Sequence, residues 1–382
     1  MGEQEEMDND RISKRIESGR QKYLSKIQGS LIGGAAGDAL GYEVEFMSDA
    51  AIRSRFGPDG ITAYELSDGT ALFSDDTQMT LFTANGLLYG ETRRMLYRTG
   101  GDPYTYIPYA YRDWLFTQDP SSKPKHIISW LADIPELHSR RAPGNTCISA
   151  IHSGRIGSIE KPLNNSCGCG GVMRVAPVGL FYGQDYPDVT DEDIVRYAAY
   201  AAVVTHGHPW GYIPAGMMSL IVNRAAFTDD PLTEVIRYSF ELTEKVFGSD
   251  DYWEGFASFI RRAVELSGND ETDRKNIRAL GEGWVGHEAL AIAVYAALRY
   301  EHDFSGAMIA AVNHDGDSDS TGAVAGNILG AYLGLEGIGS EWTEHLELKE
   351  TILSIGRDLC DHCRMDGNSA YVDPQWLKRY DR

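Results

Sequence analysis

The stretch HDGDSDSTGAVAG, residues 314–326, sets three aspartates directly before a run of small residues. Small side chains let one helix approach another closely, so this run predicts a tightly packed, buried helix. A single carboxylate in a first helical turn gains about 0.3–1 kcal/mol from the helix dipole. Asp315, Asp317 and Asp319 exceed that need, because neighbouring carboxylates repel one another. A cation bound among them would remove this conflict.

Most other long segments repeat apolar residues at intervals of three and four, as amphipathic helices do. The clearest are DVTDEDIVRYAAYAAVVTH (188–206), PLTEVIRYSFELTEKVF (231–247), HEALAIAVYAALRY (287–300) and HLELKETILSIGRDLC (345–360). Strand-like alternation is rare and short. The sequence therefore predicts an all-α fold, with one domain over residues 29–375.

Residues 1–28 form a charged N-terminal extension, acidic at its tip and then periodic like a helix. We expect it to be partly helical. Two interpretations stay open: a solvated tail whose helix lies on its own domain, or an arm that reaches a partner.

The composition limits the partners and the compartment. With 35 Lys and Arg against 56 Asp and Glu, the net charge of −21 disfavours nucleic acid and anionic membranes. No secretory signal or membrane-length apolar run is present, so a cytoplasmic location is expected.

Five cysteines do not indicate a disulfide framework. A four-thiolate zinc site from Cys167, Cys169, Cys360 and Cys363 is disfavoured, because neither pair lies in a zinc-knuckle pattern.

A second acidic cluster, FSDDTQMT (73–80), opens another predicted helix with Ser74, Asp75 and Asp76. Alone, it is an ordinary capped helix start. Carboxylates with Ser or Thr hydroxyls, and no cysteine, suit a hard ion such as Mg²⁺ or Mn²⁺. We therefore hypothesise that the two helix starts meet in one cleft and bind one or two metal ions. The alternative is two unrelated capped helices.

An EF-hand does not explain the first cluster. If Asp315 were position 1 of the loop, Gly should stand at position 6 and Glu at position 12. The sequence has Ser320 and Gly326 there. Asp315 is expected to have a loop or supporting role.

Two glycine-rich stretches complete the pattern. GGAAGDALGYEVEF (33–46) predicts a tightly packed helix followed by a turn, and it does not match a dinucleotide-binding motif. NNSCGCGGVMRVAP (164–177) predicts a loop whose backbone N–H groups could face a phosphate.

Together these elements resemble the ADP-ribosylglycohydrolase family, which includes the dinitrogenase-reductase-activating glycohydrolases. The matching stretches are GDALGYEVEF (37–46), SDDTQMTL (74–81), GNTC (144–147), GCGGVMRVAP (168–177), THGHP (205–209) and GDSDSTGAVAGNILGA (316–331). The resemblance implies a compact, orthogonal all-helical fold. It also implies Mg²⁺-dependent hydrolysis of the bond between ADP-ribose and a modified protein side chain, most plausibly arginine, which would reverse ADP-ribosyltransferase action.

Residue roles follow from the same resemblance. The implied metal ligands, for two Mg²⁺ ions or alternatively Mn²⁺, are Ser74, Asp75, Asp76, Asp317, Asp319 and Ser320. The implied catalytic carboxylates are Glu45, Asp75 and Asp76. The implied substrate-binding residues are Asn145, Ser166, Cys167, Gly168, Cys169, Gly170, Gly171 and His206. One departure is Ala142, where some arginine-directed relatives carry an aspartate, which puts a ring-opening variant of the mechanism in doubt.

Two further hypotheses remain. The chain could be an immunity protein that neutralises an ADP-ribosyltransferase toxin by enzymatic reversal or by plugging the toxin's active site with residues 1–28. It could also be an Mg²⁺-dependent hydrolase of another nucleotide or phosphate ester, or a pseudoenzyme.

Overall fold

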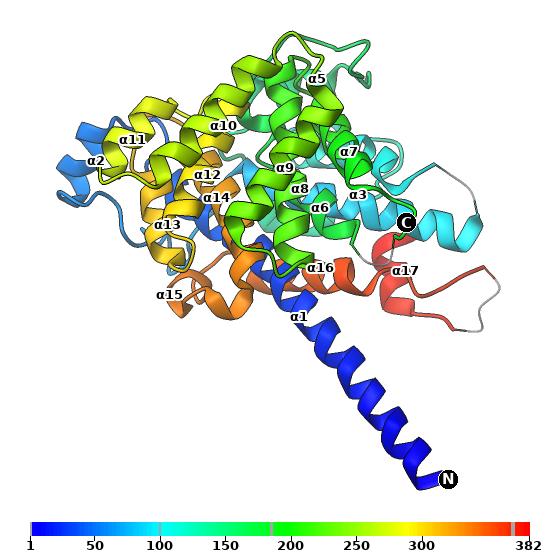
Figure 1. The fold of residues 1–382 in the computed structure, drawn as a ribbon. Helices are drawn as coiled ribbons and strands as arrows, with labels where there is room; N and C mark the ends of the chain where they lie inside the picture. The colour runs from blue at the N-terminus through cyan, green and yellow to red at the C-terminus, as the bar shows by residue number, and fades with distance from the viewer. Residues whose placement is uncertain (1, 99–100, 184–185, 368–370) are drawn as a thin grey trace.

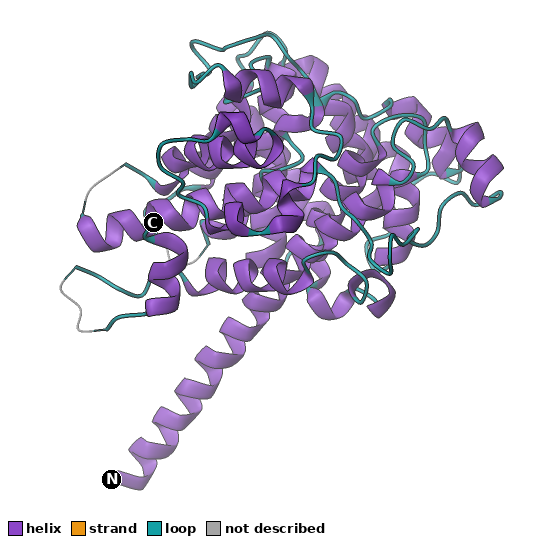
Figure 2. Cartoon of the chain, turned by 180° about the vertical axis from the view of Figure 1, so that it is seen from behind, coloured by secondary structure: helices purple, strands orange, loops and turns teal. Residues whose placement is uncertain are grey.

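The computed structural model describes residues 2–98, 101–183, 186–367 and 371–382, with side chains described from Gly19 onward. Within these ranges the chain folds into α-helices joined by loops and short 3₁₀ turns, and extended pairing is limited to isolated bridges such as Ala71 with Leu346. Figure 2 shows this helical architecture from behind. The prediction of an all-α fold is confirmed.

The helices of the first half are α1 (Gly2–Tyr42), α2 (Asp49–Phe56), α3 (Asp75–Tyr97), α4 (Ile107–Gln118), α5 (Asn145–His152), α6 (Ala176–Phe181), α7 (Asp191–Val203), α8 (Pro209–Phe227) and α9 (Leu232–Phe247). Those of the second half are α10 (Trp253–Ser267), α11 (Asp273–Leu280), α12 (Gly286–Arg299), α13 (Phe304–Val312), α14 (Ser318–Leu333), α15 (Ser340–Thr343), α16 (Lys349–Asp361) and α17 (Pro374–Tyr380). The 3₁₀ turns are η1 (Pro103–Tyr106), η2 (Pro120–Ser122), η3 (Trp130–Asp133), η4 (Pro135–His138), η5 (Cys169–Gly171) and η6 (Leu335–Gly337).

Helices α1 and α14 pack against each other at the centre of the molecule, where the blue and orange ribbons lie side by side (Figure 1). Glycines on one helix face glycines on the other in antiparallel order: Gly29 with Gly330, Gly33 with Gly326, and Gly37 with Gly322. A Cβ on Gly33 or Gly326 would overlap the opposing backbone, so the contact requires glycine. This packing places the C-terminal end of α1 beside the first residues of α14.

The N-terminal part of α1 projects away from the body of the molecule (Figure 1). The helix enters the core near Leu24 and Ile27, which are both buried. The side chains of residues 1–18 lie outside the described part of the chain. A boundary at residue 28, and a partner for the extension, stay predictions.

Helix α3 is buried from Asp75 to Thr92, so its acidic first turn starts inside the protein. The core forms one continuous apolar cluster that includes residues of α1, α3, α8, α12 and α14. Among the described residues, no helix combines the length and the apolar character that crossing a membrane requires.

Candidate active site

One cavity of about 420 Å³ lies where the starts of α3 and α14 meet. Its walls come from the turn after α1, the starts of α3 and α5, the glycine-rich loop, and the start of α14. The lining residues that the sequence predicted are Glu45, Asp75, Asp76, Asn145, Gly168, Cys169, Gly170, His206, Asp317, Asp319 and Ser320. Ser74, Ser166, Cys167 and Gly171 were also predicted but do not line this cavity.

The start of α14 presents its carboxylates to this cavity. Gly316 has φ 124°, a conformation that favours glycine, and the Asp317 N–H donates to the Glu282 carbonyl at 2.8 Å. Side-chain oxygens of Glu45, Asp317 and Asp319 all lie within 4.8 Å of one another. Asp319 belongs to α14, Asp317 is its N-cap, and Glu45 follows α1, so the glycine packing of the two helices builds this cluster.

Cys169 adds a sulfur atom to the same corner of the cavity. Its thiol donates to Asp317 Oδ2 at 2.7 Å, and the Ser320 hydroxyl donates to Cys169 Sγ at 3.5 Å. The metal hypothesis drawn from the sequence counted no cysteine among the ligands. Nothing in the spacing of residues so far apart in the chain indicates this contact.

Polar contacts from α1 hold the start of α3. Ser74 is the N-cap, and its hydroxyl accepts the Asp76 N–H at 3.3 Å. Asp38 accepts the N–H groups of Ser74 at 2.8 Å and Thr77 at 2.9 Å. Burial and the nearby Asp319 raise the pKa of Asp38 to about 7. No role was predicted for Asp38, although its position beside the glycines at 37 and 41 indicated a buried part of the helix.

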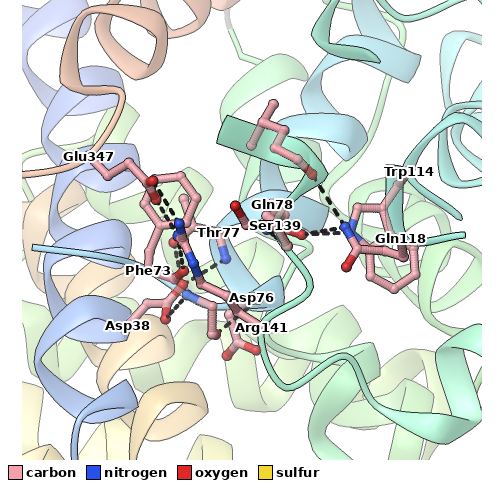
Figure 3. A network of polar contacts seen from close by, with 12 residues as sticks. Asp38, Phe73, Asp76, Thr77, Gln78, Trp114, Gln118, Ser139, Arg141 and Glu347 are labelled. Carbon is pink, nitrogen blue, oxygen red and sulfur yellow. Dashed lines mark hydrogen bonds and ion pairs between the residues drawn. The ribbon is translucent and has the colours of Figure 1, made fainter. Parts of the chain in front are cut away.

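An ion pair supports α3 from the other side (Figure 3). Arg141 donates to Glu347 Oε1 at 2.9 Å and to the Phe73 carbonyl at 2.9 Å. The Arg141 carbonyl in turn accepts the Asp75 N–H at 3.2 Å. Both side chains of the pair are largely buried, with 12% and 7% of their surface exposed. Arg141 therefore ties the start of α3 to the segment before α16.

The cavity concentrates negative charge away from water. Burial and neighbouring carboxylates raise the pKa of Glu45 to about 10 and the pKa values of Asp75, Asp76 and Asp317 well above their usual range. Asp76 Oδ2 and Glu45 Oε2 are buried without a hydrogen-bond partner. Such oxygens suit a divalent cation, which binds carboxylates and offsets their repulsion. The donor set fits a metal ion.

The glycine-rich loop and a histidine form another part of the cavity wall. The Cys169 N–H donates to the Trp284 carbonyl at 3.1 Å, which fixes the loop beside the start of α12. Burial and the Arg174 cation lower the pKa of His206 to about 3, so its imidazole is neutral. His206 contributes hydrogen bonding and shape rather than charge.

Two aromatic rings that sequence reasoning missed line the cavity on its solvent side. Phe46 and Trp284 stack with ring centroids 5.5 Å apart and are 72% and 37% exposed. Phe46 has φ 65°, an uncommon conformation for a large side chain. Because Phe46 directly follows Glu45 in the sequence, its location beside the site could have been predicted.

Asp315 and the second cysteine pair lie elsewhere. Asp315 lines a neighbouring cavity of about 560 Å³, where it accepts the Asp49 N–H at 2.8 Å and faces Arg278. Cys360 lies in the last turn of α16 and Cys363 just after it, and none of the five cysteines, all within the described residues, forms a disulfide. Among the described residues, the one cluster of His, Cys, Asp and Glu ligands is Glu45, Asp317 and Asp319.

Fold and site together define an all-helical protein with an acidic cavity, suited to a divalent ion, beside a glycine-rich loop. The family model for ADP-ribosylglycohydrolase matches residues 19–369, and the chain belongs to that family. The resemblance seen in the sequence is confirmed. Membership supports a glycohydrolase that acts on ADP-ribosylated substrates.

Individual relatives agree with this assignment. ADP-ribosylhydrolase ARH3 of Mus musculus is 24% identical over 355 residues, covering 85% of this chain and 88% of the relative. An uncharacterized protein of Archaeoglobus fulgidus is 28% identical, covering 89% of this chain and 98% of its own length. A solved structure described as an ADP-ribosylglycohydrolase-related protein complex matches with a TM-score of 0.57 at 23% identity, covering 89% of this chain and 98% of that chain. This last similarity supports the fold.

Proposed function

We propose that this protein hydrolyses the bond between ADP-ribose and modified arginine side chains of a protein substrate, with divalent cations bound in the acidic cavity. The observation that carries the proposal is the meeting of two acidic helix starts beside the glycine-rich loop in one cavity. The family supports the general reaction. The choice of arginine, the identity of the ion and the roles of individual residues go beyond what the family supports and are proposed for this chain.

The ions are proposed to be two Mg²⁺, with Mn²⁺ as the alternative. The residues proposed to hold them are Ser74, Asp75 and Asp76 at the start of α3 and Asp317, Asp319 and Ser320 at the start of α14. When bound, such ions supply Lewis-acid stabilisation and lower the pKa of a coordinated water. Asp76 Oδ2, buried and without a partner, supports this assignment on the α3 side. Ser74 Oγ caps its own helix, so its binding to an ion would replace that hydrogen bond.

The ADP-ribose group is proposed to lie along the glycine-rich loop, Ser166–Gly171. The loop closely approaches His206, because a Cβ on Gly170 would lie 2.7 Å from the imidazole Cε1. The N–H groups of Ser166, Gly168 and Cys169 are bonded within the protein, so the diphosphate is proposed to face the other N–H groups of the loop. The neutral His206 and the exposed Asn145 complete the binding wall.

Proton transfer is proposed for Glu45, Asp75 and Asp76. A water oxygen bonds to C1″ of the ribose while the bond from C1″ to the arginine nitrogen breaks, and the water's proton passes to a carboxylate. Asp76 is proposed to accept it. Glu45, which lies in one cluster with Asp317 and Asp319, is proposed to donate a proton to the departing nitrogen.

The acidic cavity supports arginine as the modified residue, because a guanidinium group is cationic and carboxylates stabilise it. Ala142 and Pro143 lie in the cavity wall and provide no carboxylate there. The reaction proposed therefore uses direct attack at C1″ and requires no ring opening.

The test is incubation of the full chain with arginine-, serine- and nucleic-acid-linked ADP-ribose, each with Mg²⁺, with Mn²⁺ and with a chelator. We expect metal-dependent release of ADP-ribose from the arginine conjugate at the highest rate. Asp317→Asn should abolish release, whereas Asp315→Asn, in the neighbouring cavity, should retain it. Faster release from serine would overturn the arginine assignment, and release that persists in the chelator would overturn the metal dependence.

A second proposal is toxin immunity through residues 1–28, supported by the projection of α1 from the body of the molecule (Figure 1). Leu24 and Ile27 are buried, so deletion through residue 27 would damage the core. Deletion of residues 1–18 is the sharper variant. It should abolish binding to an ADP-ribosyltransferase domain and preserve hydrolysis. Undiminished binding by the truncated chain would refute the plugging role.

A further inference from the structure

The acidic cavity contains a sulfur atom in direct contact with two proposed metal ligands. Cys169 Sγ lies 2.7 Å from Asp317 Oδ2 and 3.5 Å from Ser320 Oγ. In protein metal sites, sulfur lies about 2.3 Å and oxygen about 2.0–2.2 Å from an ion such as Zn²⁺. Two such ligands of one tetrahedral ion are about 3.6 Å apart. The Cys169 and Asp317 atoms therefore need only a small side-chain rotation to share an ion.

A second observation marks the same place as a ligand site. Asp76 lines the same cavity, is 2% exposed, and its Oδ2 has no hydrogen-bond partner. A buried carboxylate oxygen without a partner costs stability unless a cation or donor is bound there.

We propose that Cys169 is a thiolate ligand of this cavity for borderline divalent ions such as Co²⁺ and Zn²⁺, which bind through Cys169 Sγ together with Asp317 and Ser320. This inference rests on the ion site of the proposed function and adds a second class of ion to it. Mg²⁺ binds through oxygen atoms alone, because it is a hard ion. On binding Co²⁺ or Zn²⁺, the thiol loses its proton to solvent and the sulfur lone pair forms the bond to the ion.

This set of ligands makes the site bind borderline divalent ions differently from Mg²⁺. A thiolate strengthens binding of borderline and soft ions and contributes nothing to the binding of Mg²⁺. Zn²⁺ is therefore expected to displace the activating ion and to hold the glycine-rich loop against the start of α14.

The experiment is a Co²⁺ titration of the metal-free full-length protein, followed by near-ultraviolet absorption. A cobalt–thiolate bond produces an intense charge-transfer band that an all-oxygen site lacks. We expect the band in the wild type and its loss in Cys169→Ser. Cys167→Ser, two residues away and outside the cavity lining, is the matched control and should keep the band. Co²⁺ affinity should fall by about tenfold or more in Cys169→Ser, while Mg²⁺ affinity changes by less than about twofold.

X-ray absorption at the cobalt edge of the wild type gives an independent measurement that needs no variant. A sulfur neighbour at about 2.3 Å is expected. Cobalt bound with only oxygen or nitrogen neighbours would overturn the role of Cys169 and leave the proposed function intact. Failure to bind Co²⁺, Mg²⁺ and Mn²⁺ alike would overturn both.

Discussion

The starts of α3 and α14 present carboxylates to the same cavity, but the protein positions them by different means. Hydrogen bonds and an ion pair hold the start of α3: Asp38 binds its first N–H groups and Arg141 binds the segment before it. The start of α14 has no side-chain cap, and apart from the backbone bond from Asp317 to Glu282 its position follows from glycine contacts between α1 and α14. Hydrogen bonds and the ion pair orient the start of α3, whereas close packing sets the distance between α1 and the start of α14.

This difference predicts how mutations would damage the start of α3 and the start of α14. Loss of a polar contact leaves buried donors or acceptors without partners, and the effect depends on charge and pH. Replacement of a packed glycine by a larger residue forces the two backbones apart, and the resulting loss of stability depends on the added volume alone. The predictions below separate these two kinds of failure.

The largest loss of activity is expected when a carboxylate at the start of α3 or of α14 is removed. Asp76→Ala and Asp317→Ala should each lower kcat/KM by more than about 10³-fold, since a bound ion contributes several kcal/mol to the reaction. The double variant should be scarcely slower than either single one, because both starts act on one reaction. Multiplicative losses, measured as kcat/KM for ADP-ribose release, would show that the two starts work separately.

The next effect concerns the packing of α14. Gly326→Ala places a Cβ against the Gly33 backbone and should lower the free energy of unfolding by about 3 kcal/mol. The matched control is Gly19→Ala on α1, where nothing lies within 4 Å of the added Cβ. That variant should raise stability by about 0.5–1 kcal/mol, because alanine favours helix over glycine. Denaturant unfolding of both proteins measures the contrast, and equal effects would refute the packing argument.

The same contrast explains what the sequence could predict. The acidic starts of α3 and α14 are local patterns, so Asp75, Asp76, Asp317 and Asp319 could be found from neighbouring residues alone. The glycines at 33 and 37 predicted close packing, but local sequence does not identify the helix they face. Long-range contacts supplied the rest, including the approach of Cys169 to Asp317 and the support of α3 by Glu347.

A smaller effect is expected from the ion pair that supports α3. Arg141→Met leaves the buried Glu347 carboxylate unpaired and should cost about 2 kcal/mol of stability. Because the Phe73 carbonyl also loses its donor, the affinity for divalent ions should fall by about tenfold. Glu347→Gln in the same background should restore part of the stability, since it removes the unpaired charge. Calorimetric titration with Mn²⁺ and thermal unfolding provide the two measurements, and an unchanged affinity would show that the pair only stabilises the fold.

The smallest effect tests polar support through pH. Asp113 on α4 accepts the N–H groups of Ile128 and Ser129 through Oδ2, each at 2.8 Å, while its other oxygen has no partner. Burial raises the pKa of Asp113 to about 7, above its value in the unfolded chain. The folded state thus holds this proton more tightly, and its stabilising contribution is complete below about pH 4 and lost as pH rises toward 7. In Asp113→Asn the amide oxygen can keep both hydrogen bonds, so the stability difference between variant and wild type should grow by about 1 kcal/mol in favour of the variant between pH 6 and pH 7. The Gly326→Ala deficit should stay constant over the same range, because it arises from volume, and a parallel pH dependence in both variants would remove the distinction between polar support and glycine packing.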